Sequence, residues 1–247
     1  MHRFFLPPVA IQTDSVLFPL ETAHQILRVL RLRVGDTVIV LDNLGGQYRV
    51  ELTLVSSEQV RGRVIDKTLA EGEPPVHLSM YLCLTQREKF EWMLQKCTEV
   101  GAAEFTPVLS GRSLVQDKHA YENKHSRWER IIQEAAEQSG RGKIPRLNLP
   151  LDYAAAVETA RAKNGICLVA WEEETTLRLP DALKGVPSGA NLALLIGPEG
   201  GLTAEEVNQA VQMGWKAVSL GPRILRMETA AVVSAALMID WFETRAG

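Results

Sequence analysis

The chain has 247 residues, of which 46% are hydrophobic and 23% are charged, and its formal net charge is −3 at pH 7. A chain of this length and composition buries at least one sizeable hydrophobic core, which excludes intrinsic disorder as its main state. Its mild acidity excludes a uniformly basic coat, so a nucleic-acid partner would have to meet a local basic patch.

No segment of the sequence has the composition of a membrane span. The longest stretch without a charged residue, 185–198, has 14 residues, whereas a span needs about 20 apolar residues. The three cysteines, Cys83, Cys97 and Cys167, form no C-x-x-C pair, which argues against a disulfide framework and against structural zinc. We therefore expect a cytoplasmic protein without a membrane partner.

Residues 1–72 are dominated by short runs of β-branched residues with turn signals between them. Three of these runs predict strands, over 37–42, 47–55 and 59–65. Asn and Gly within 43–46 favour a hairpin turn, so this part of the chain indicates a small β-barrel. The sequence EGEPP at 71–75 then interrupts the pattern, because Pro-Pro cannot continue a central strand. We place the domain boundary there, giving domains 1–72 and 73–247.

After Pro75 the pattern changes to alternating strands and helices. Apolar runs typical of buried strands lie at 76–84, 105–109, 166–171, 191–196 and 217–220. Apolar residues at helical spacing predict helices at 87–101, around 128–135, at 203–214 and from about 228. Thr203 and Glu206 form a capping box at the start of the third helix. The second domain is therefore predicted to be α/β, with a mostly parallel sheet.

The common catalytic signatures are absent from the sequence. It contains no G-x-S-x-G, H-E-x-x-H or G-x-G-x-x-G motif, and Gly142-Lys143 lacks the Ser or Thr and the upstream Gly of a phosphate loop. Hydrolase, zinc-enzyme and NTPase functions therefore lose most of their support.

Two predicted strands run directly into glycine-containing loops. GPEGG (197–201) follows the strand at 191–196, and GPRILRMETAA (221–231) follows the strand at 217–220. Glycine lets a flat ligand approach the backbone, and α/β proteins bind ligands at the carboxyl ends of parallel strands. Alone, the first loop fits a simple tight turn equally well, and the second fits an Arg–Glu ion pair at a helix start. Together they could form one pocket.

An ordered series of short motifs accompanies these loops over nearly the whole chain. It consists of His24, 29–31 (VLR), 34–36 (VGD), 96–101 (KCTEVG), Pro107, 112–113 (RS), 134–139 (EAAEQS), Arg141, Pro145, 196–201 (IGPEGG), 220–221 (LG) and 224–230 (ILRMETA). With this series the chain resembles the bacterial small-subunit rRNA uridine-N3 methyltransferases of the RsmE type. These enzymes belong to the SPOUT class of S-adenosylmethionine-dependent RNA methyltransferases.

The resemblance implies a fold and a cofactor site. The expected fold is an α/β SPOUT domain with a C-terminal trefoil knot, its parallel sheet flanked by helices, preceded by a PUA-like β-barrel that helps to hold rRNA. The expected cofactor is S-adenosylmethionine, with no metal. Its expected contacts are Ile196, Gly197, Pro198, Glu199, Gly200, Gly201, Leu220, Gly221, Ile224, Leu225, Arg226, Thr229 and Ala230.

Methylation at N3 of uridine requires removal of the proton on that nitrogen. We therefore expect Arg226 and Glu228 to be the catalytic residues, with Arg226 stabilising negative charge on the base and Glu228 accepting the proton. Glu199 is the alternative acceptor, and either carboxylate could instead only orient the loops.

Charge is distributed unevenly along the sequence. Residues 112–146 contain eight Lys and Arg against five Asp and Glu, whereas 147–247 contain eight against twelve. The expected RNA contacts are Arg3, His24, Arg28, Arg31, Arg33, Arg112, Gln138 and Arg141. The alternative interpretation is an ordinary solvated surface.

The resemblance further implies small-subunit rRNA as the partner, either alone or within an assembled 30S particle, and a homodimer. Two other functions stay open. One is a SPOUT enzyme with another target, such as ribose 2′-O or guanine N1, and the other is a non-catalytic RNA-binding assembly factor. The intact pair of loops argues against the latter, and the N-terminal matches favour uridine N3.

Overall fold

The structure is a computed structural model that describes residues 1–113, 119–163 and 165–244. The chain forms two compact units. Unit 1 comprises Met1–Glu73 and Gln133–Ile144, and unit 2 comprises Pro74–Ile132 and Pro145–Gly247. Residues 133–144, which the sequence analysis assigned to the second domain, thus belong to unit 1. The domain limits at 1–72 and 73–247 stay a prediction.

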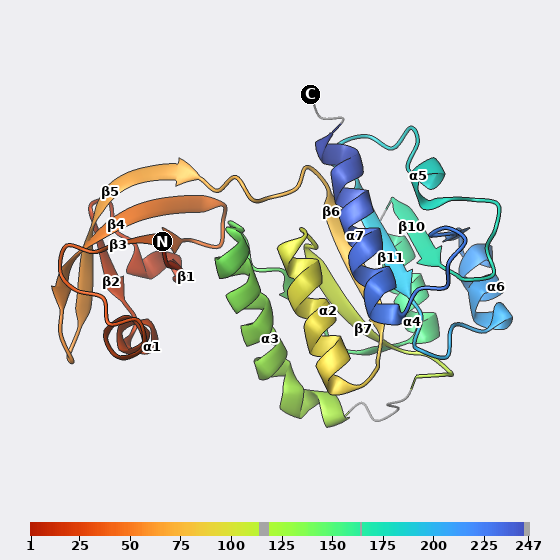
Figure 1. The fold of residues 1–247 in the computed structure, drawn as a ribbon, viewed down its shortest axis with the longest axis horizontal. Coiled ribbons are helices and arrows are strands. Elements are labelled where there is room, and N and C mark those ends of the chain that lie inside the picture. The colour runs from red at the N-terminus through yellow and green to blue at the C-terminus, as the bar shows by residue number, and fades with distance from the viewer. Residues whose placement is uncertain (114–118, 164, 245–247) are drawn as a thin grey trace. The chain divides into compact units, whose positions relative to one another are not determined.

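Unit 1 is built on a five-stranded sheet with the order β1-β3-β4-β5-β2 (Figure 1). Its strands are β1 (Arg3–Phe5), β2 (Ser15–Phe18), β3 (Thr37–Leu41), β4 (Gly46–Val55) and β5 (Val60–Leu69). The three strands predicted here are confirmed as β3, β4 and β5. Strand β5 continues past its predicted end at residue 65 because it pairs with β4 up to Leu69, which lies opposite Gly46. Asn43 and Gly45 have φ angles of 59° and 101° in the predicted turn.

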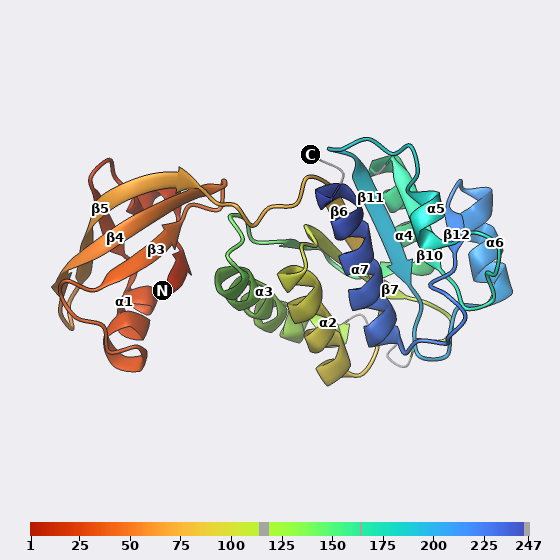
Figure 2. The same cartoon turned by 45° about the horizontal axis from the view of Figure 1, so that its top comes forward.

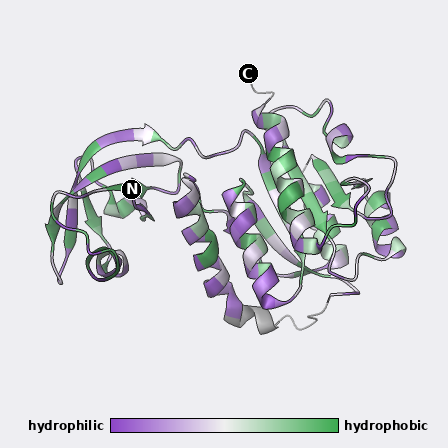
Figure 3. Cartoon of the chain, viewed as in Figure 1, coloured by the Kyte–Doolittle hydropathy of each residue, from purple (hydrophilic) through white to green (hydrophobic). Residues whose placement is uncertain are grey.

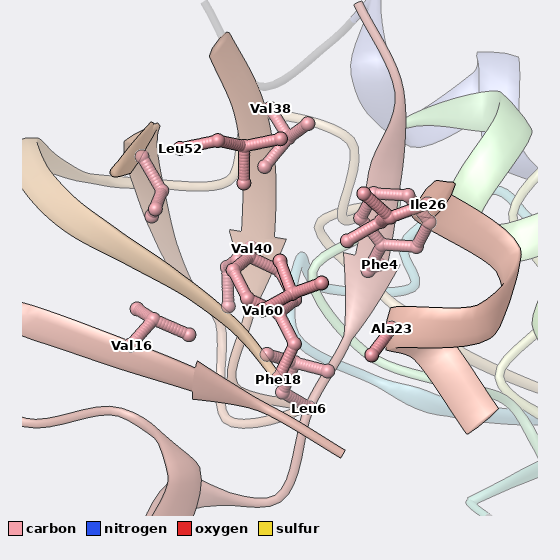
Figure 4. Packing of buried hydrophobic residues seen from close by; sticks show 11 residues of the cluster. Phe4, Leu6, Val16, Phe18, Ala23, Ile26, Val38, Val40, Leu52 and Val60 are labelled. Atoms are coloured by element: carbon pink, nitrogen blue, oxygen red, sulfur yellow. The ribbon is translucent and has the colours of Figure 1, made fainter. Parts of the chain in front are cut away.

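The sheet of unit 1 buries hydrophobic side chains on both faces. Because side chains alternate along a strand, Val38 and Val40 of β3 enter one cluster and Ile39 and Leu41 enter another. The first cluster, shown in Figure 4, also receives Ile26 from the π-helical turn Gln25–Val29, which follows α1 (Leu20–His24). The short turn Pro8–Ala10 completes this unit. Neither these helical segments nor β1 and β2 were predicted from the sequence.

The second face of the sheet is covered by the segment 133–144. Its Ala136 packs with Phe5, Ile39 and Leu41. The carboxylate of Glu137 accepts a hydrogen bond of 3.0 Å from the backbone N–H of Phe5. These contacts explain why a segment distant in sequence belongs to unit 1.

Unit 2 contains a seven-stranded sheet whose pairs are all parallel (Figure 2). The order is β12-β10-β11-β6-β7-β8, with β9 also paired to β7. The strands are β6 (His77–Cys83), β7 (Glu104–Leu109), β8 (Arg146–Leu147), β9 (Leu151–Asp152), β10 (Ile166–Ala170), β11 (Asn191–Ile196) and β12 (Lys216–Val218). The five strands predicted for this domain are confirmed as β6, β7, β10, β11 and β12.

Helices cover both faces of this sheet. The helices of unit 2 are α2 (Arg87–Glu99), α4 (Tyr153–Lys163), α5 (Leu179–Ala182), α6 (Ala204–Gln212) and α7 (Met227–Glu243). Helix α3 (His119–Ser139) belongs to unit 2 as far as Ile132 and to unit 1 from Gln133. Helices α2 and α7 pack together over one face, and α4 and α6 over the other. Figure 3 shows hydrophobic residues gathered along β10, β11 and α7. None of the described helices is both long and apolar enough to cross a membrane.

Helix ends follow the predicted local signals. At the start of α6, Thr203 Oγ1 accepts a hydrogen bond from the backbone of Glu206, whose carboxylate accepts one from the backbone of Thr203. Gly101 and Gly214, which follow α2 and α6, have φ angles of 116° and 88°. The predicted α/β domain after a small β-unit is confirmed, whereas the trefoil knot stays a prediction.

Candidate functional site

Three adjacent parallel strands of unit 2, β12, β10 and β11, end at the same edge of the sheet. The loop after β10 begins at Trp171, the loop after β11 at Gly197 and the loop after β12 at Ser219. The β12 loop leads directly into α7. This carboxyl edge is where open α/β sheets bind ligands.

The three loops enclose a pocket with two lobes. The first lobe has a volume of about 440 Å³ and lies between the β10 and β12 loops. The second has a volume of about 300 Å³ and is lined by the β11 loop, the start of α7 and Lys89 of α2. The residues lining both lobes are Ala170, Glu172, Ile224, Leu225 and Ala230. With these shared walls the two lobes lie side by side, and their size is typical of cavities that bind small molecules.

The predicted cofactor residues gather at this pocket. All of them except Gly200 and Thr229 line one of the two lobes. Ile196, Gly197, Pro198, Glu199 and Gly201 reach the second lobe from the β11 loop, and Leu220 and Gly221 reach the first lobe from the β12 loop. Their contact with a cofactor stays a prediction.

Glycine is needed at two positions for different reasons. Gly201 has a φ angle of 70°, and a Cβ placed there would overlap the carboxylate of Glu172. Gly221 has a φ angle of 112°, and a Cβ there would meet no atom within 4 Å. Gly201 therefore admits a neighbouring side chain, whereas Gly221 leaves open space beside the first lobe.

Side chains from other elements fix the β11 loop. Glu199 accepts hydrogen bonds from the Thr85 hydroxyl and, at 3.2 Å, from Lys89 Nζ. Partial burial raises the pKa of Glu199, but hydrogen bonds from Thr85, its own backbone and Lys89 outweigh burial and hold the pKa below its usual value. This carboxylate is therefore engaged in positioning the loop.

Arg226 and Glu228 lie at the start of α7, and both line the second lobe. Arg226 is the exposed N-cap residue, whose carbonyl accepts a 2.8 Å hydrogen bond from the backbone of Ala230. Glu228 is half-buried in the first turn. Within the described residues, neither side chain forms a hydrogen bond or an ion pair. The Arg–Glu pair that the sequence analysis considered does not form, and both groups stay available to a substrate.

The predicted RNA-binding residues fall into different environments. His24, Arg28, Arg31, Arg33 and Gln138 are exposed on unit 1, and Arg3 is partly buried there. Arg112 is exposed on unit 2, where its Nη1 donates a 2.9 Å hydrogen bond to the carbonyl oxygen of Gly200.

Arg141 differs from the other RNA-binding candidates because it is 2% exposed. Its Nε and Nη2 atoms lie 2.8 and 3.0 Å from the carboxylate oxygens of Glu73. This geometry gives Arg141 a place in the internal framework of unit 1, so we omit it from the RNA surface proposed below.

The part of the pocket that the β10 loop provides was not predicted from the sequence. Trp171, Glu172 and Arg178 line the first lobe, and Glu172 also lines the second. The available signal was the predicted strand at 166–171, whose carboxyl end lies at the same sheet edge as the two glycine loops. Lys89 and Thr85 carried no local signal of their own.

Comparisons with known proteins identify the family. Residues 72–239 match the family model described as RNA methyltransferase domain, and residues 21–65 match that of the RNA methyltransferase PUA domain. The chain is 36% identical over 239 residues to ribosomal RNA small subunit methyltransferase E of Bacillus subtilis, with 93% of each chain covered. The chain belongs to the ribosomal RNA small subunit methyltransferase E family.

Solved structures agree with membership of the methyltransferase E family. A ribosomal RNA small subunit methyltransferase E from Neisseria gonorrhoeae, bound to S-adenosyl methionine, has a TM-score of 0.87 and 30% identity, with 96% of each chain covered. The putative methyltransferase Lpg2936 from Legionella pneumophila, in complex with the cofactor SAM, has a TM-score of 0.80 and 28% identity, again with 96% of each chain covered. Among the described residues of this member of the methyltransferase E family, no group of three or more His, Cys, Asp or Glu side chains could hold a metal ion.

Proposed function

We propose that this protein transfers a methyl group from S-adenosylmethionine to N3 of a uridine in small-subunit ribosomal RNA. Family membership establishes the coarser statement, a methyltransferase of small-subunit rRNA that uses S-adenosylmethionine. The observation that carries the finer proposal is the position of Arg226 and Glu228 on the same lobe as the glycine loop of β11.

The residues present fit the cofactor. S-adenosylmethionine supplies an electrophilic methyl group on a sulfonium centre. The two adjacent lobes, of about 440 and 300 Å³, fall within the usual size of small-molecule sites. The open space at Gly221 lets a ligand approach the backbone, and the side chains of Ile196 and Leu225 offer apolar contact.

The task of the protein is to hold the target base in line with the methyl donor and to exclude water. Because N3 of uridine carries a proton, a base must remove it before the nitrogen can act as a nucleophile. Glu228 is suited to this step because its acceptor atoms have no partner within the described residues. Arg226 would stabilise the negative charge that develops on the adjacent carbonyl oxygens of the base.

The proposed RNA surface is the exposed polar group of unit 1. It consists of His24, Arg28, Arg31, Arg33 and Gln138. Cationic side chains that contact phosphates release counterions, so RNA affinity should fall steeply as salt rises. An affinity that hardly changes between about 50 and 200 mM salt would contradict this surface.

We propose further that the enzyme acts in the cytoplasm as a homodimer, on small-subunit rRNA either alone or within an assembled 30S particle. Three buried free cysteines, Cys83, Cys97 and Cys167, support a reducing compartment. The exposed apolar side chains of Val233 and Leu237 on α7 support a dimer contact. Sedimentation that shows only monomer at micromolar concentration would contradict the dimer. Methylation rates measured on naked rRNA and on 30S particles distinguish the two substrates.

The deciding experiment is mass spectrometry of nucleosides from 16S rRNA of a deletion strain complemented with variants. The wild-type gene should restore 3-methyluridine, whereas Arg226→Ala and Glu228→Gln should not. Glu199→Gln should restore part of it, because that carboxylate only holds the loop. Full methylation by the Arg226 variant would overturn its role. Restoration of a different methylated nucleoside would overturn the uridine-N3 target.

A further inference from the structure

Three consecutive glutamates, Glu172, Glu173 and Glu174, follow β10. A run of like charges usually marks a solvated loop, yet these side chains lie in different environments. Glu174 Oε1 accepts hydrogen bonds of 2.6 and 3.1 Å from the backbones of Thr176 and Leu177. Hydrogen bonds from Thr176 are the main reason that the pKa of Glu174 lies below its usual value. Glu174 therefore stabilises its own turn.

Glu172 and Glu173 are both exposed, but of the two only Glu172 lines the pocket, where it borders both lobes. The carboxylate of Glu172 lies directly against the α-carbon of Gly201, where a Cβ would overlap its Oε1 atom. This contact places the carboxylate of the β10 loop beside the glycine turn of the β11 loop. The Glu172 side chain thus lies where the two lobes meet.

The oxygens of Glu172 have unfilled acceptor capacity. In the described part of the chain, this side chain takes part in no hydrogen bond and no ion pair. An ionised carboxylate is an acceptor only, with two oxygens that can receive two parallel hydrogen bonds. In a ligand that spans both lobes, the middle part of the molecule would lie beside Glu172. The group that donates to this carboxylate should therefore be central in the ligand and carry two neighbouring hydrogen-bond donors.

We propose that Glu172 binds the ribose of the cofactor by accepting hydrogen bonds from its 2′ and 3′ hydroxyl groups. This inference rests on the proposed function, since it takes S-adenosylmethionine as the ligand. The ribose lies between the adenine and the amino-acid part of that molecule, and its vicinal hydroxyls match a bidentate acceptor. The α-ammonium group is terminal and would occupy one lobe only. Carboxylates in strand-end loops accept ribose hydroxyls in other α/β folds.

The experiment measures ligand affinity by calorimetry on the full-length protein. The ligands are S-adenosylhomocysteine, 5′-methylthioadenosine, which has the ribose but lacks the amino-acid part, and the 2′-deoxy analogue of 5′-methylthioadenosine. We expect Glu172→Gln to reduce the affinity for S-adenosylhomocysteine and for 5′-methylthioadenosine by the same factor, about tenfold or more. The wild type should prefer the hydroxylated thioadenosine over its deoxy analogue, and Glu172→Gln should lose this preference. Glu173→Gln is the matched control and should bind all three like the wild type.

Three outcomes would overturn the inference. The first is wild-type affinity of Glu172→Gln for both hydroxylated ligands, and the second is a loss confined to S-adenosylhomocysteine, which would assign Glu172 to the ammonium group. The third is failure of the wild type itself to bind S-adenosylhomocysteine, which would overturn the proposed function as well. Thermal unfolding without ligand checks that both Gln variants are folded, and Glu172→Asp provides a second variant with the charge retained.

Discussion

Arg112 donates a hydrogen bond of 2.9 Å from Nη1 to the carbonyl oxygen of Gly200. The backbone N–H of the preceding residue, Gly111, donates one of 2.9 Å to Glu206 Oε1 at the start of α6. The turn after β7 thus supports the β11 loop from outside the pocket. Arg112, which was expected on the RNA surface, thus also stabilises the loop that we propose binds the cofactor.

The first prediction concerns this support. Arg112→Ala should weaken S-adenosylhomocysteine binding about fivefold, because one such hydrogen bond contributes about 1 kcal/mol. Arg33→Ala, which removes an exposed arginine of unit 1, should leave this affinity unchanged and reduce only RNA binding. Calorimetry with both variants makes the comparison, and equal cofactor affinity in Arg112→Ala and wild type would contradict the supporting role.

The second prediction separates backbone strain from loss of the site. Gly201 and Gly189 have φ angles of 70° and 82°, but only a Cβ on Gly201 would meet another atom within 4 Å. Both Gly→Ala variants should lose about 1 kcal/mol of stability, since L-residues are disfavoured in this region. Only Gly201→Ala should also lose cofactor affinity, by about tenfold or more, because it displaces Glu172. Thermal unfolding and calorimetry provide the two measurements, and normal affinity of Gly201→Ala would contradict this account.

The third prediction concerns the framework of unit 1. Glu73 pairs with the buried Arg141 and also accepts hydrogen bonds of 2.9 and 3.1 Å from the backbones of Gly142 and Lys143. Removing one partner of a buried ion pair is costly, so Glu73→Ala should lower the unfolding free energy of unit 1 by about 3 kcal/mol.

The control for this prediction is the pair of Arg63 and Glu51, whose side chains are 68% and 34% exposed in the same unit. Glu51→Ala should cost less than about 1 kcal/mol. Hydrogen exchange of the β3 and β4 amides reports on this unit alone. Similar losses of unfolding free energy in Glu73→Ala and Glu51→Ala would show that the burial of Arg141 adds nothing to the strength of its ion pair.

The fourth prediction is a dependence of stability on pH. The hydrogen bond from His77 is the largest cause that lowers the pKa of Glu104 from 4.5 to about 2; burial opposes it, and Asn148 and Lys163 lower the pKa further. A carboxylate whose pKa is depressed in the folded state stabilises the fold at pH values above its pKa in the unfolded state. This contribution is lost as the pH falls toward the folded-state pKa. Wild type should therefore lose this contribution between pH 4.5 and about 2.

Glu104→Gln should be less stable than wild type at pH 6, with the difference shrinking as pH approaches 2. Urea unfolding at a series of pH values measures this difference. Glu158→Gln, which changes an exposed residue on α4, should parallel wild type throughout. A constant offset between Glu104→Gln and wild type at every pH would assign the effect to packing instead of charge.

The strands and capped helices could be predicted where their signals are local. The β-branched runs of β3 and β4 and the capping box at Thr203 need no distant contact to be recognised. By contrast, β1 and β2 have three and four residues, too few to show an alternation of buried and exposed positions. Helix α4 is rich in alanine, which gives its faces little contrast, and it is positioned by packing on β7, β9 and β10.

The same distinction applies to the site. The two glycine loops follow strand ends, so both could be found from sequence. Glu172 acquires its position from a contact with Gly201 on another loop, and a run of three glutamates carries no sign of it. Arg141 lies in a basic stretch that resembles an exposed surface, whereas its partner Glu73 lies 68 positions earlier in the chain.

The discontinuity of unit 1 bears on how the protein is made. Its sheet is synthesised early, but Ala136, which covers Phe5, Ile39 and Leu41, is added only after residues 74–132 of the other unit. Until the segment 133–144 has been synthesised, it cannot cover the second face of the unit 1 sheet. A complete unit 1 therefore never exists without the beginning of the methyltransferase unit on the same chain.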